Sequence, residues 1–595
     1  MAKKDFLQGQ SCTAYDDFCA KIDKNGVTFT TYAPHAANVK LLYNDAEYQM
    51  TKDSNGVWEV YVEGACEGGI YQYAITNHTF QTYVRSDPFA FYSQVRPQTA
   101  SVVYNIDDYS WKDSEWIESR DKCYEKPMNI YEVHFGSWRT KFDSEEDDRL
   151  YSYDEMIDLL IPYVKDMGYT HIELMPIMEY PFDGSWGYQV TGYFSATSRY
   201  GEPRGLMRFI DACHNAGIGV ILDFVPVHFV TDFYALHMYD GGFLFESDYE
   251  DQRYSEWSTA LFDYTKPHVL SFIKSSINFW IEKYHADGIR YDAVAYLIYK
   301  YGRKENPIND SGIWFLKNTN YAIQKMHPDV MLFAEDSTDY EKVTAPVEFG
   351  GLGFDYKWDL GYMNDTINYV KTPPFERGKH HNKMTFSMSY FYNNLYILPY
   401  SHDEVVHGKQ TMLDKCFGTH EEKIATIKAL YTFQFTHPGK KLNFMGNELG
   451  EYMEWRYYKE LGWNLLAYPS HDSLHEYLKK LHHIYLEEPS LFKYDYNSSS
   501  FRWIDANNNR QSIFAFQRND LNGNKLYMIF NFSGIKQRYD LHVDENCHYE
   551  EILNSDRDIY AGSNCLNNNL NSFNYTLPLN LAACSCTIIK KVYRL

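Results

Sequence analysis

Four apolar segments of this 595-residue chain each end in acidic or polar side chains that could carry chemistry. The segment ends read DFVPVH (223–228), GIRYDAV (288–294), AEDST (334–338) and SHDE (401–404). The side chains concerned are Asp223, His228, Arg290, Asp292, Glu335, Asp336, His402, Asp403 and Glu404. A carboxylate beside an apolar segment costs free energy unless it is paired or used. One such residue could be a cap or a buried ion-pair partner, but four such segments favour one shared site.

Several carboxylates with an arginine, and no metal-ligand, Ser–His or Cys–His pattern, fit glycosidic bond cleavage. Retaining cleavage needs two carboxyl groups roughly 5–5.5 Å apart, one as nucleophile and one as acid/base. Asp292 lies two residues after Arg290 on the same side of a strand, so the guanidinium lowers the pKa of this carboxyl. Glu335 follows the apolar run VMLFA. A low-dielectric setting raises the pKa of a carboxyl group, which lets it act as a general acid. We therefore expect Asp292 as nucleophile, Glu335 as acid/base, and Asp403 opposite them, stabilising positive charge on the sugar.

The elements that must hold these residues alternate between apolar strands and helical segments from Asn129 onward. Strand candidates are 129–136, 170–177, 218–229, 288–294, 330–336, 395–404 and 441–448. Helices are expected over 152–168, opened by a Ser cap, and over 203–217, ended by a Gly. Buried strands alternating with helices over roughly 300 residues predict a (β/α)8 barrel, whose catalytic groups gather at the C-terminal ends of its strands. A doubly wound sheet is the alternative, although no GxGxxG opens a helix.

Short alternating strands flank this region on both sides. Residues 27–34, 38–43, 56–63 and 70–76 predict an N-terminal β-sandwich. After about residue 491 the segments 511–518, 525–533 and 586–595, between Asn-rich turns, predict a second β-sandwich. We therefore expect three domains: an N-terminal β-sandwich over 1–110, a catalytic barrel over 111–490, and a C-terminal all-β domain over 491–595. The run SDPFAFYSQVRPQTASVV (86–103) of the first domain resembles the end of a carbohydrate-binding module.

Composition narrows the class of partner. A net charge of −24 repels nucleic acid and anionic membranes, so neither is expected as a partner. Aromatic residues make up 17% of the chain, with 55 Tyr, a bias that suits sugar binding but also fits a lineage preference. No signal peptide or transmembrane segment is visible, and the ten Cys are scattered singly. These features predict a cytoplasmic protein with reduced thiols.

The four segment ends, in their order along the chain, are similar to the four motif regions of the α-amylase superfamily, glycoside hydrolase family 13. The resemblance implies the roles given above for Asp292, Glu335 and Asp403. It also implies that Tyr188 stacks below the sugar ring at the cleavage point, and that Trp186 is either a sugar platform or part of the loop core. The remaining residues implied to hold substrate or the catalytic carboxylates are Asp223, His228, Arg290 and His402.

Longer runs resemble the branching enzymes within that superfamily. They are YEVHFGSWR (131–139), SWGYQVTGYFSATSRYG (185–201), GLGFDYKWDLGYMNDT (352–366), LPYSHDEVVHGK (398–409) and HPGKKLNFMGNE (437–448). This resemblance implies cleavage of α-1,4-glucan, such as amylose or glycogen, and transfer to form α-1,6 branches. We expect no cofactor, and a monomer or weak oligomer. The loops 185–201 and 231–264 are long enough to hold an acceptor chain. The second of these loops offers His237, Tyr239, Phe243, Phe245, Tyr249 and Trp257.

Two other functions share parts of this pattern. A hydrolase of the same fold, either an α-amylase or a debranching enzyme, has the same three acids, so only the flanking runs separate it from a transferase. A non-catalytic glucan-binding protein would be expected to lack one of the acids. Val227 stands where many members of the superfamily carry an Asn that helps to bind calcium, so no metal is expected. Glu404 and Glu448 are expected in structural salt bridges.

Overall fold

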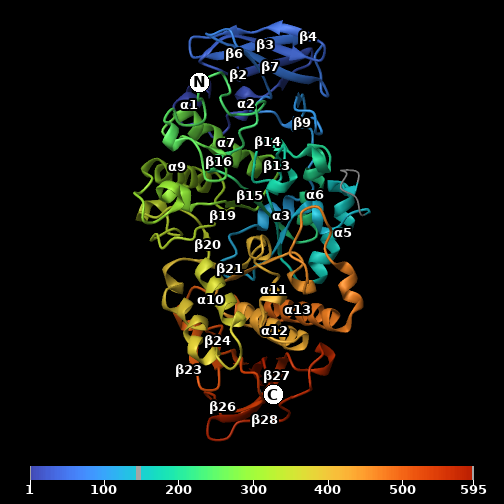
Figure 1. Cartoon of the computed structure of the whole chain (residues 1–595), viewed down its shortest axis with the longest axis vertical. Helices are drawn as coiled ribbons and strands as arrows, with labels where there is room; N and C mark the ends of the chain where they lie inside the picture. Colours follow the sequence, from blue (N-terminus) through green and yellow to red (C-terminus); the bar gives the residue numbers. More distant parts are fainter. Residues whose placement is uncertain (1, 143–148, 593–595) are drawn as a thin grey trace. The chain divides into compact units, whose positions relative to one another are not determined.

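The alternating segments near the start of the chain form a β-sandwich in a computed structural model that describes residues 2–142 and 149–592. One sheet has the order β1-β2-β6-β5, and the other β4-β3-β7-β10-β9, with β8 paired to β7. Figure 1 labels β2, β3, β4, β6 and β7 of these two layers. The bounds are β1 Lys21–Ile22, β2 Gly26–Tyr32, β3 Ala36–Tyr43, β4 Ala46–Gln49, β5 Thr51–Lys52, β6 Val57–Glu63, β7 Ile70–Asn77, β8 Thr82–Arg85, β9 Tyr92–Ser93 and β10 Ser101–Val102. Alternate residues of β3 and β7 are buried, so the predicted sandwich is confirmed.

Eight strands form a closed barrel in the order β11-β12-β15-β18-β19-β20-β21-β22. Their bounds are β11 Asn129–Val133, β12 His171–Leu174, β15 Gly219–Phe224, β18 Gly288–Tyr291, β19 Met331–Ala334, β20 Tyr356–Trp358, β21 Tyr396–Tyr400 and β22 Lys440–Phe444. Every residue of these strands is buried, as expected for parallel strands covered on both faces. Each of the seven predicted segments overlaps a strand, and only β22 begins before its segment, by one residue. The barrel prediction is confirmed. The eighth strand, β20, was not predicted because three residues are too few to show a periodic pattern.

The helices between these strands begin and end where local chemistry dictates. The backbone N–H of Ser152 donates to Oε2 of Glu155 at 2.8 Å, and the N–H of Glu155 donates to Oγ of Ser152 at 3.2 Å. This reciprocal cap opens α5. Gly217, with φ +81°, follows α6 and lets the chain leave the helix. The longer helices are α5 Tyr153–Asp166, α6 Pro203–Asn215, α7 Pro267–Glu282, α9 Asp310–Met326, α10 Leu360–Lys371, α12 His420–Thr436 and α13 Pro469–Glu487.

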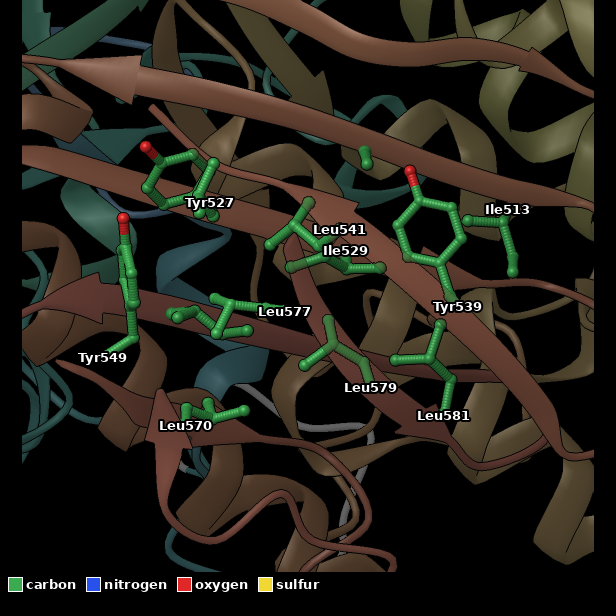
Figure 2. Close-up of a cluster of buried hydrophobic side chains, with 13 residues drawn as sticks. Ile513, Tyr527, Ile529, Tyr539, Leu541, Tyr549, Leu570, Leu577, Leu579 and Leu581 are labelled. Atoms are coloured by element: carbon green, nitrogen blue, oxygen red, sulfur yellow. The ribbon is translucent and has the colours of Figure 1, made fainter. Parts of the chain in front are cut away.

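A second β-sandwich closes the described part of the chain. A six-stranded sheet has the order β23-β24-β25-β30-β27-β28, and β26 pairs with β29. The bounds are β23 Phe501–Asn508, β24 Ile513–Asn519, β25 Lys525–Asn531, β26 Gln537–His542, β27 His548–Asn554, β28 Leu570–Asn571, β29 Thr576–Leu581 and β30 Ser585–Lys591. Figure 2 shows the core that both sheets share, with Ile529, Leu541 and Leu579 fully buried. The predicted C-terminal β-sandwich is confirmed; residues 593–595 of the strand predicted over 586–595 lie outside the described residues.

The chain divides into two compact units. The first comprises Met1–Lys122, His134–Ile161 and Glu173–Asp355, and the second comprises Cys123–Val133, Pro162–Ile172 and Tyr356–Leu595. The predicted site residues from Trp186 to Asp336 belong to the first unit, and those from His402 to Glu404 belong to the second. Among the described residues, no helix has both the length and the apolar composition needed to span a membrane.

Candidate active site

A buried ion pair joins two neighbouring barrel strands of the first unit. The parallel register of β15 and β18 sets Asp223 beside Arg290. Nη1 of Arg290 donates to both carboxylate oxygens of Asp223, at 2.8 and 2.9 Å. Arg290 is only 2% exposed and Asp223 only 1%. Because both groups are charged and fully desolvated, each depends on the other, and their geometry is tightly fixed.

Asp292 lies in the turn that follows β18. Its backbone N–H donates to the carbonyl of Phe224 at 2.9 Å, which ties the turn to the end of β15. Its carboxylate accepts a hydrogen bond of 2.8 Å from the same Nη1 of Arg290 that binds Asp223. The side chain is 17% exposed, so it is oriented by the buried arginine but accessible at one edge. A carboxylate held in this way is suited to act as a nucleophile.

Glu335 follows β19 and lies beside the same arginine. Its Oε2 accepts the backbone N–H of Ala293 at 2.7 Å and lies 3.9 Å from Nη2 of Arg290. Ala293 has φ +51°, an uncommon left-handed conformation for a residue with a side chain. This conformation belongs to the residue directly after Asp292, where strain is often retained for function. The surroundings of Glu335 are therefore more polar than the apolar run before it suggested.

The charge state of Arg290 follows from this arrangement. Burial alone would lower the pKa of the guanidinium, but the carboxylates of Asp223, Asp292 and Glu335 raise that pKa well above its usual value. Arg290 is thus a permanent cation at the centre of three acids. Asp336 is the residue next to Glu335. Its carboxylate accepts from the N–H and the hydroxyl of Thr338, at 3.0 and 3.1 Å, and so shapes the loop.

Tyr188 reaches the same cluster from a tight turn. Its hydroxyl donates to Oδ2 of Asp223 at 2.5 Å. The turn depends on Gly187, which has φ +95° and where a Cβ would lie 2.3 Å from the carbonyl oxygen of Pro176. Only glycine fits there, and this fixes where Tyr188 can point. Trp186 is half-buried with φ +57°, and its assignment as sugar platform or loop core stays a prediction.

His228 lies on the short strand β16 (His228–Phe229), paired with β17 (Ala260–Leu261). The ring is buried, and desolvation lowers the pKa of His228 to about 4. It is therefore neutral near pH 7 and can offer one N–H to an uncharged hydroxyl. Nδ1 has no hydrogen-bond partner among the described residues. An uncharged imidazole suits a neutral sugar, which needs hydrogen bonds rather than charge.

His402, in the second unit, is held by a glutamate that the sequence patterns did not single out. Nδ1 of His402 lies 2.6 Å from Oε1 of Glu132, and the backbone N–H of His402 donates to Oε2 at 3.1 Å. The hydroxyl of Ser401 also donates to Glu132, at 3.0 Å. Glu132 is fully buried on β11. The available signal was a single charged residue inside the apolar strand NIYEV, which needs a partner when buried.

Asp403 follows His402 in the short 3-10 helix η10 (His402–Val405). Its Oδ1 lies 3.6 Å from Nε2 of His402, and its side chain is 65% exposed, so a substrate can reach it. The loop after it is held by Lys415, whose Nζ donates to the carbonyls of Lys409 and Gln410 at 2.7 and 2.6 Å, and also to that of Glu404. Burial lowers the pKa of Lys415 to about 8.

The two salt bridges expected of Glu404 and Glu448 have different outcomes. Glu404 lies 3.4 Å from Nζ of Lys409, as predicted. The salt bridge predicted for Glu448 is wrong. Its Oε1 accepts the hydroxyls of Tyr131 and Tyr163 at 2.6 and 2.8 Å. Burial raises the pKa of this carboxyl, because no cation offsets its desolvation among the contacts of Glu448 in the described residues.

The loop over 231–264 offers less surface than the sequence suggested. Tyr239 and Phe245 are buried, which corrects their assignment to an acceptor surface. The hydroxyl of Tyr239 lies 2.8 Å from that of Thr31, so this residue packs against the N-terminal sandwich. Tyr249 and Trp257 are exposed, at 69% and 43%. Large aromatic side chains on a loop are therefore a poor guide to exposure, because many of them pack the loop itself.

Three family models match parts of the chain. Residues 16–90 match carbohydrate-binding module 48 (isoamylase N-terminal domain), residues 154–258 match the alpha amylase catalytic domain, and residues 503–592 match the alpha amylase C-terminal all-beta domain. Two pullulanase structures show the same fold. One, from Paenibacillus barengoltzii, has TM-score 0.76 at 16% identity and covers 100% of this chain and 96% of its own. The other, from Bacillus acidopullulyticus, has TM-score 0.72 at 17% identity and covers 96% and 74%.

The barrel and its flanking sandwiches, together with acids at the strand ends, define the α-amylase class of carbohydrate-active enzymes. A 1,4-alpha-glucan branching enzyme of Geobacillus stearothermophilus is 44% identical over 577 residues, covering 94% of this chain and 90% of the relative. A branching enzyme of Bacillus cereus is 44% identical over 553 residues, covering 91% and 85%. The chain belongs to the 1,4-alpha-glucan branching enzyme family, whose members are glycosyltransferases.

Proposed function

We propose that this chain cuts α-1,4-glucan and rejoins the cut piece through an α-1,6 bond, with Asp292, Glu335 and Asp403 as its catalytic residues. The observation that carries the proposal is the shared guanidinium of Arg290, 2.8 Å from Asp292 and 3.9 Å from Glu335. A single buried cation thus lies beside two carboxyl groups. This pairing is what retaining cleavage requires.

In the first step, a carboxylate oxygen of Asp292 attacks the anomeric carbon of the donor chain. Glu335 gives its proton to the glycosidic oxygen, and the reducing-end segment departs. Positive charge develops at the anomeric centre during this step, and Asp403 stabilises it. The product is a glycosyl ester on Asp292, with the ionised form of Glu335 beside it.

In the second step, the 6-hydroxyl of an acceptor chain replaces the departed segment. Glu335 takes the hydroxyl proton while the oxygen attacks the anomeric carbon and releases Asp292. Two inversions retain the α configuration. The neutral imidazole of His228 and the hydroxyl-bearing ring of Tyr188 bind the sugar, while Arg290 and His402 hold the carboxylates and the ring in place.

A trapping experiment tests these roles. The Glu335→Gln variant is incubated with an α-maltosyl fluoride, whose leaving group needs no proton, and the digested protein is analysed by mass spectrometry. We expect a glycosyl adduct on the peptide that contains Asp292, because deglycosylation needs the missing base. The double variant that also carries Asp292→Asn is the control and should show no adduct. An adduct on another carboxylate would overturn the assignment of the nucleophile.

The substrate is an α-glucan, and two further properties stay predictions. We infer a cytoplasmic location and a monomer or weak oligomer. The large negative charge supports an uncharged polysaccharide rather than nucleic acid or an anionic membrane as the partner. Light scattering of the purified protein would measure its mass in solution, and fractionation of the source cells would test the location.

A further inference from the structure

Trp257 is presented to solvent by a loop that is built to hold it. Tyr254 and Ala260 form an isolated antiparallel bridge, and the N–H of Ser255 donates to the carbonyl of Thr259 at 2.9 Å. Inside this turn, the N–H of Trp257 donates to Oγ of Ser255 at 3.1 Å. The same Oγ lies 2.6 Å from the hydroxyl of Thr259. The turn is thus closed by its own polar groups, yet it leaves 43% of Trp257 exposed.

The exposed indole is the middle member of a row of three rings. Its centroid lies 5.1 Å from that of His228 and 4.8 Å from that of Tyr296, both at tilted angles. The hydroxyl of Tyr296 donates to Oε1 of Glu256 at 2.7 Å, which fixes this ring from the side of the Trp257 loop. A large, rigid, half-exposed ring loses little conformational entropy when a ligand covers it.

This row of rings is connected to the acid/base. Tyr296 lies on the short helix α8 (Ala295–Ile298), directly after the segment that contacts Glu335. Within that segment, Ala293 donates to Oε2 of Glu335 at 2.7 Å, and Val294 donates to the carbonyl of Glu335 at 2.9 Å. In the second chemical step the acceptor hydroxyl must reach Glu335. An acceptor chain lying along Tyr296 and Trp257 would approach from that side.

We propose that Trp257, supported by Tyr296, is a binding platform for the acceptor α-glucan chain. A glucose ring has an apolar face of C–H groups that can cover an indole, while its rim of hydroxyls stays hydrated. The proposal rests on the function proposed above and names the site that lets an acceptor compete with water. Water is present at about 55 M, so an acceptor must be held at a high effective concentration to win.

The experiment compares Trp257→Ala, Trp257→Phe and Phe233→Ala on amylose. Phe233 is the matched control, because it is an exposed aromatic of the same loop, at 77% exposure, that is not among the expected acceptor residues. For each protein, α-1,6 links are counted by proton NMR and new reducing ends by a colorimetric assay. We expect the ratio of links to reducing ends to fall on the order of tenfold in Trp257→Ala. Trp257→Phe should stay within about twofold of the wild type, because a ring is retained.

The outcomes separate the two proposals. Wild-type protein that forms no α-1,6 links would refute the function itself. Wild-type protein that forms them, with Trp257→Ala matching Phe233→Ala in the ratio, would overturn the platform. A raised KM for amylose with an unchanged ratio would also overturn it, because Trp257 would then serve the donor. The initial burst of fluoride from an α-maltosyl fluoride reports the first step, which comes before acceptor attack. It should be unchanged in Trp257→Ala and controls for folding.

Discussion

Asp292, Asp223 and Glu335 all lie beside Arg290, and the proposed chemistry depends on that shared cation. Removing one partner of a buried ion pair leaves the other uncompensated, at a cost of about 3–5 kcal/mol. Substitutions of Arg290 or Asp223 would therefore disturb folding and catalysis together. Asp292 and Glu335 are better targets, because each is partly exposed and can be replaced by a nearly isosteric amide.

Asp292→Asn should abolish branching while leaving the fold intact. The amide keeps an oxygen for the hydrogen bond from Arg290 but cannot form a stable ester with the anomeric carbon. We expect activity on amylose to fall by more than about a thousandfold, with an unchanged circular dichroism spectrum. Near-normal activity in the purified, folded variant would show that another group is the nucleophile.

Glu335→Gln should affect the cleavage of two substrates differently. The leaving group of a glucan needs a proton, so cleavage should fall roughly 10²–10⁴-fold. The first step with an α-maltosyl fluoride needs none, and the initial burst of fluoride should survive. Stopped-flow measurement of that burst decides the matter, and an equal loss on both substrates would mean that Glu335 is not the acid.

Glu132→Gln tests a residue that acts through His402. The amide keeps the size of the side chain but loses the charge that fixes Nδ1 of His402, 2.6 Å away. We expect kcat/KM to fall roughly tenfold, the loss of a hydrogen bond to a charged group. Glu448→Gln is the control, since it removes another buried carboxylate of the same unit without touching His402. Equal effects of the two substitutions on kcat/KM would argue for a purely structural role of Glu132.

A buried histidine links three elements of the first unit and predicts how stability depends on pH. His214, at the end of α6, lies 2.8 Å from Asp113, just before α3 (Ser114–Ser119), and 2.9 Å from Asp287, just before β18. Burial opposes its charge, but Asp287 and Asp113 prevail and raise the pKa of His214 to about 9. The charged form is therefore favoured by folding.

The raised pKa of His214 determines how the free energy of unfolding changes with pH. Stability from His214 is fully present below the unfolded pKa of about 6.5 and is lost as the pH rises through 9. The charged form of His214 contributes on the order of 3 kcal/mol to the free energy of unfolding. Urea unfolding at pH 6 and pH 9.5 should show this loss in the wild type and a smaller one in His214→Gln. Equal pH dependence in both proteins would show that His214 is not the group responsible.

The elements were easier to predict than the contacts between them. Seven barrel strands could be predicted, because a strand that is buried on both faces is a short apolar run. Strand β20 could not be predicted, because it has only three residues. The acids were found because they stand at strand ends, where a charge is unexpected. The bond between Glu132 and His402 joins residues 270 positions apart, and the carbonyls gathered by Lys415 are backbone groups. Neither leaves a local pattern in the sequence.

Metal dependence concerns the whole catalytic domain. Val227 is apolar and buried where many members of the superfamily carry an Asn near calcium, and it offers no oxygen ligand from its side chain. Branching activity should therefore survive exhaustive chelation with EDTA. The measurement is the initial rate on amylose before and after dialysis against the chelator. Loss of activity, with recovery on adding calcium, would refute this expectation.

The central claim is transfer rather than hydrolysis, and in the proposed mechanism both reactions pass through the same glycosyl ester on Asp292. They differ only in whether an acceptor hydroxyl or water attacks it. The direct measurement is a time course on amylose that follows α-1,6 links by proton NMR, reducing ends by colour and iodine staining. We predict that iodine staining falls as α-1,6 links accumulate. Almost no new reducing ends should appear, because the anomeric carbon of each transferred chain becomes bonded to an acceptor hydroxyl. Reducing ends that rise in step with the loss of staining, without detectable α-1,6 links, would contradict the account.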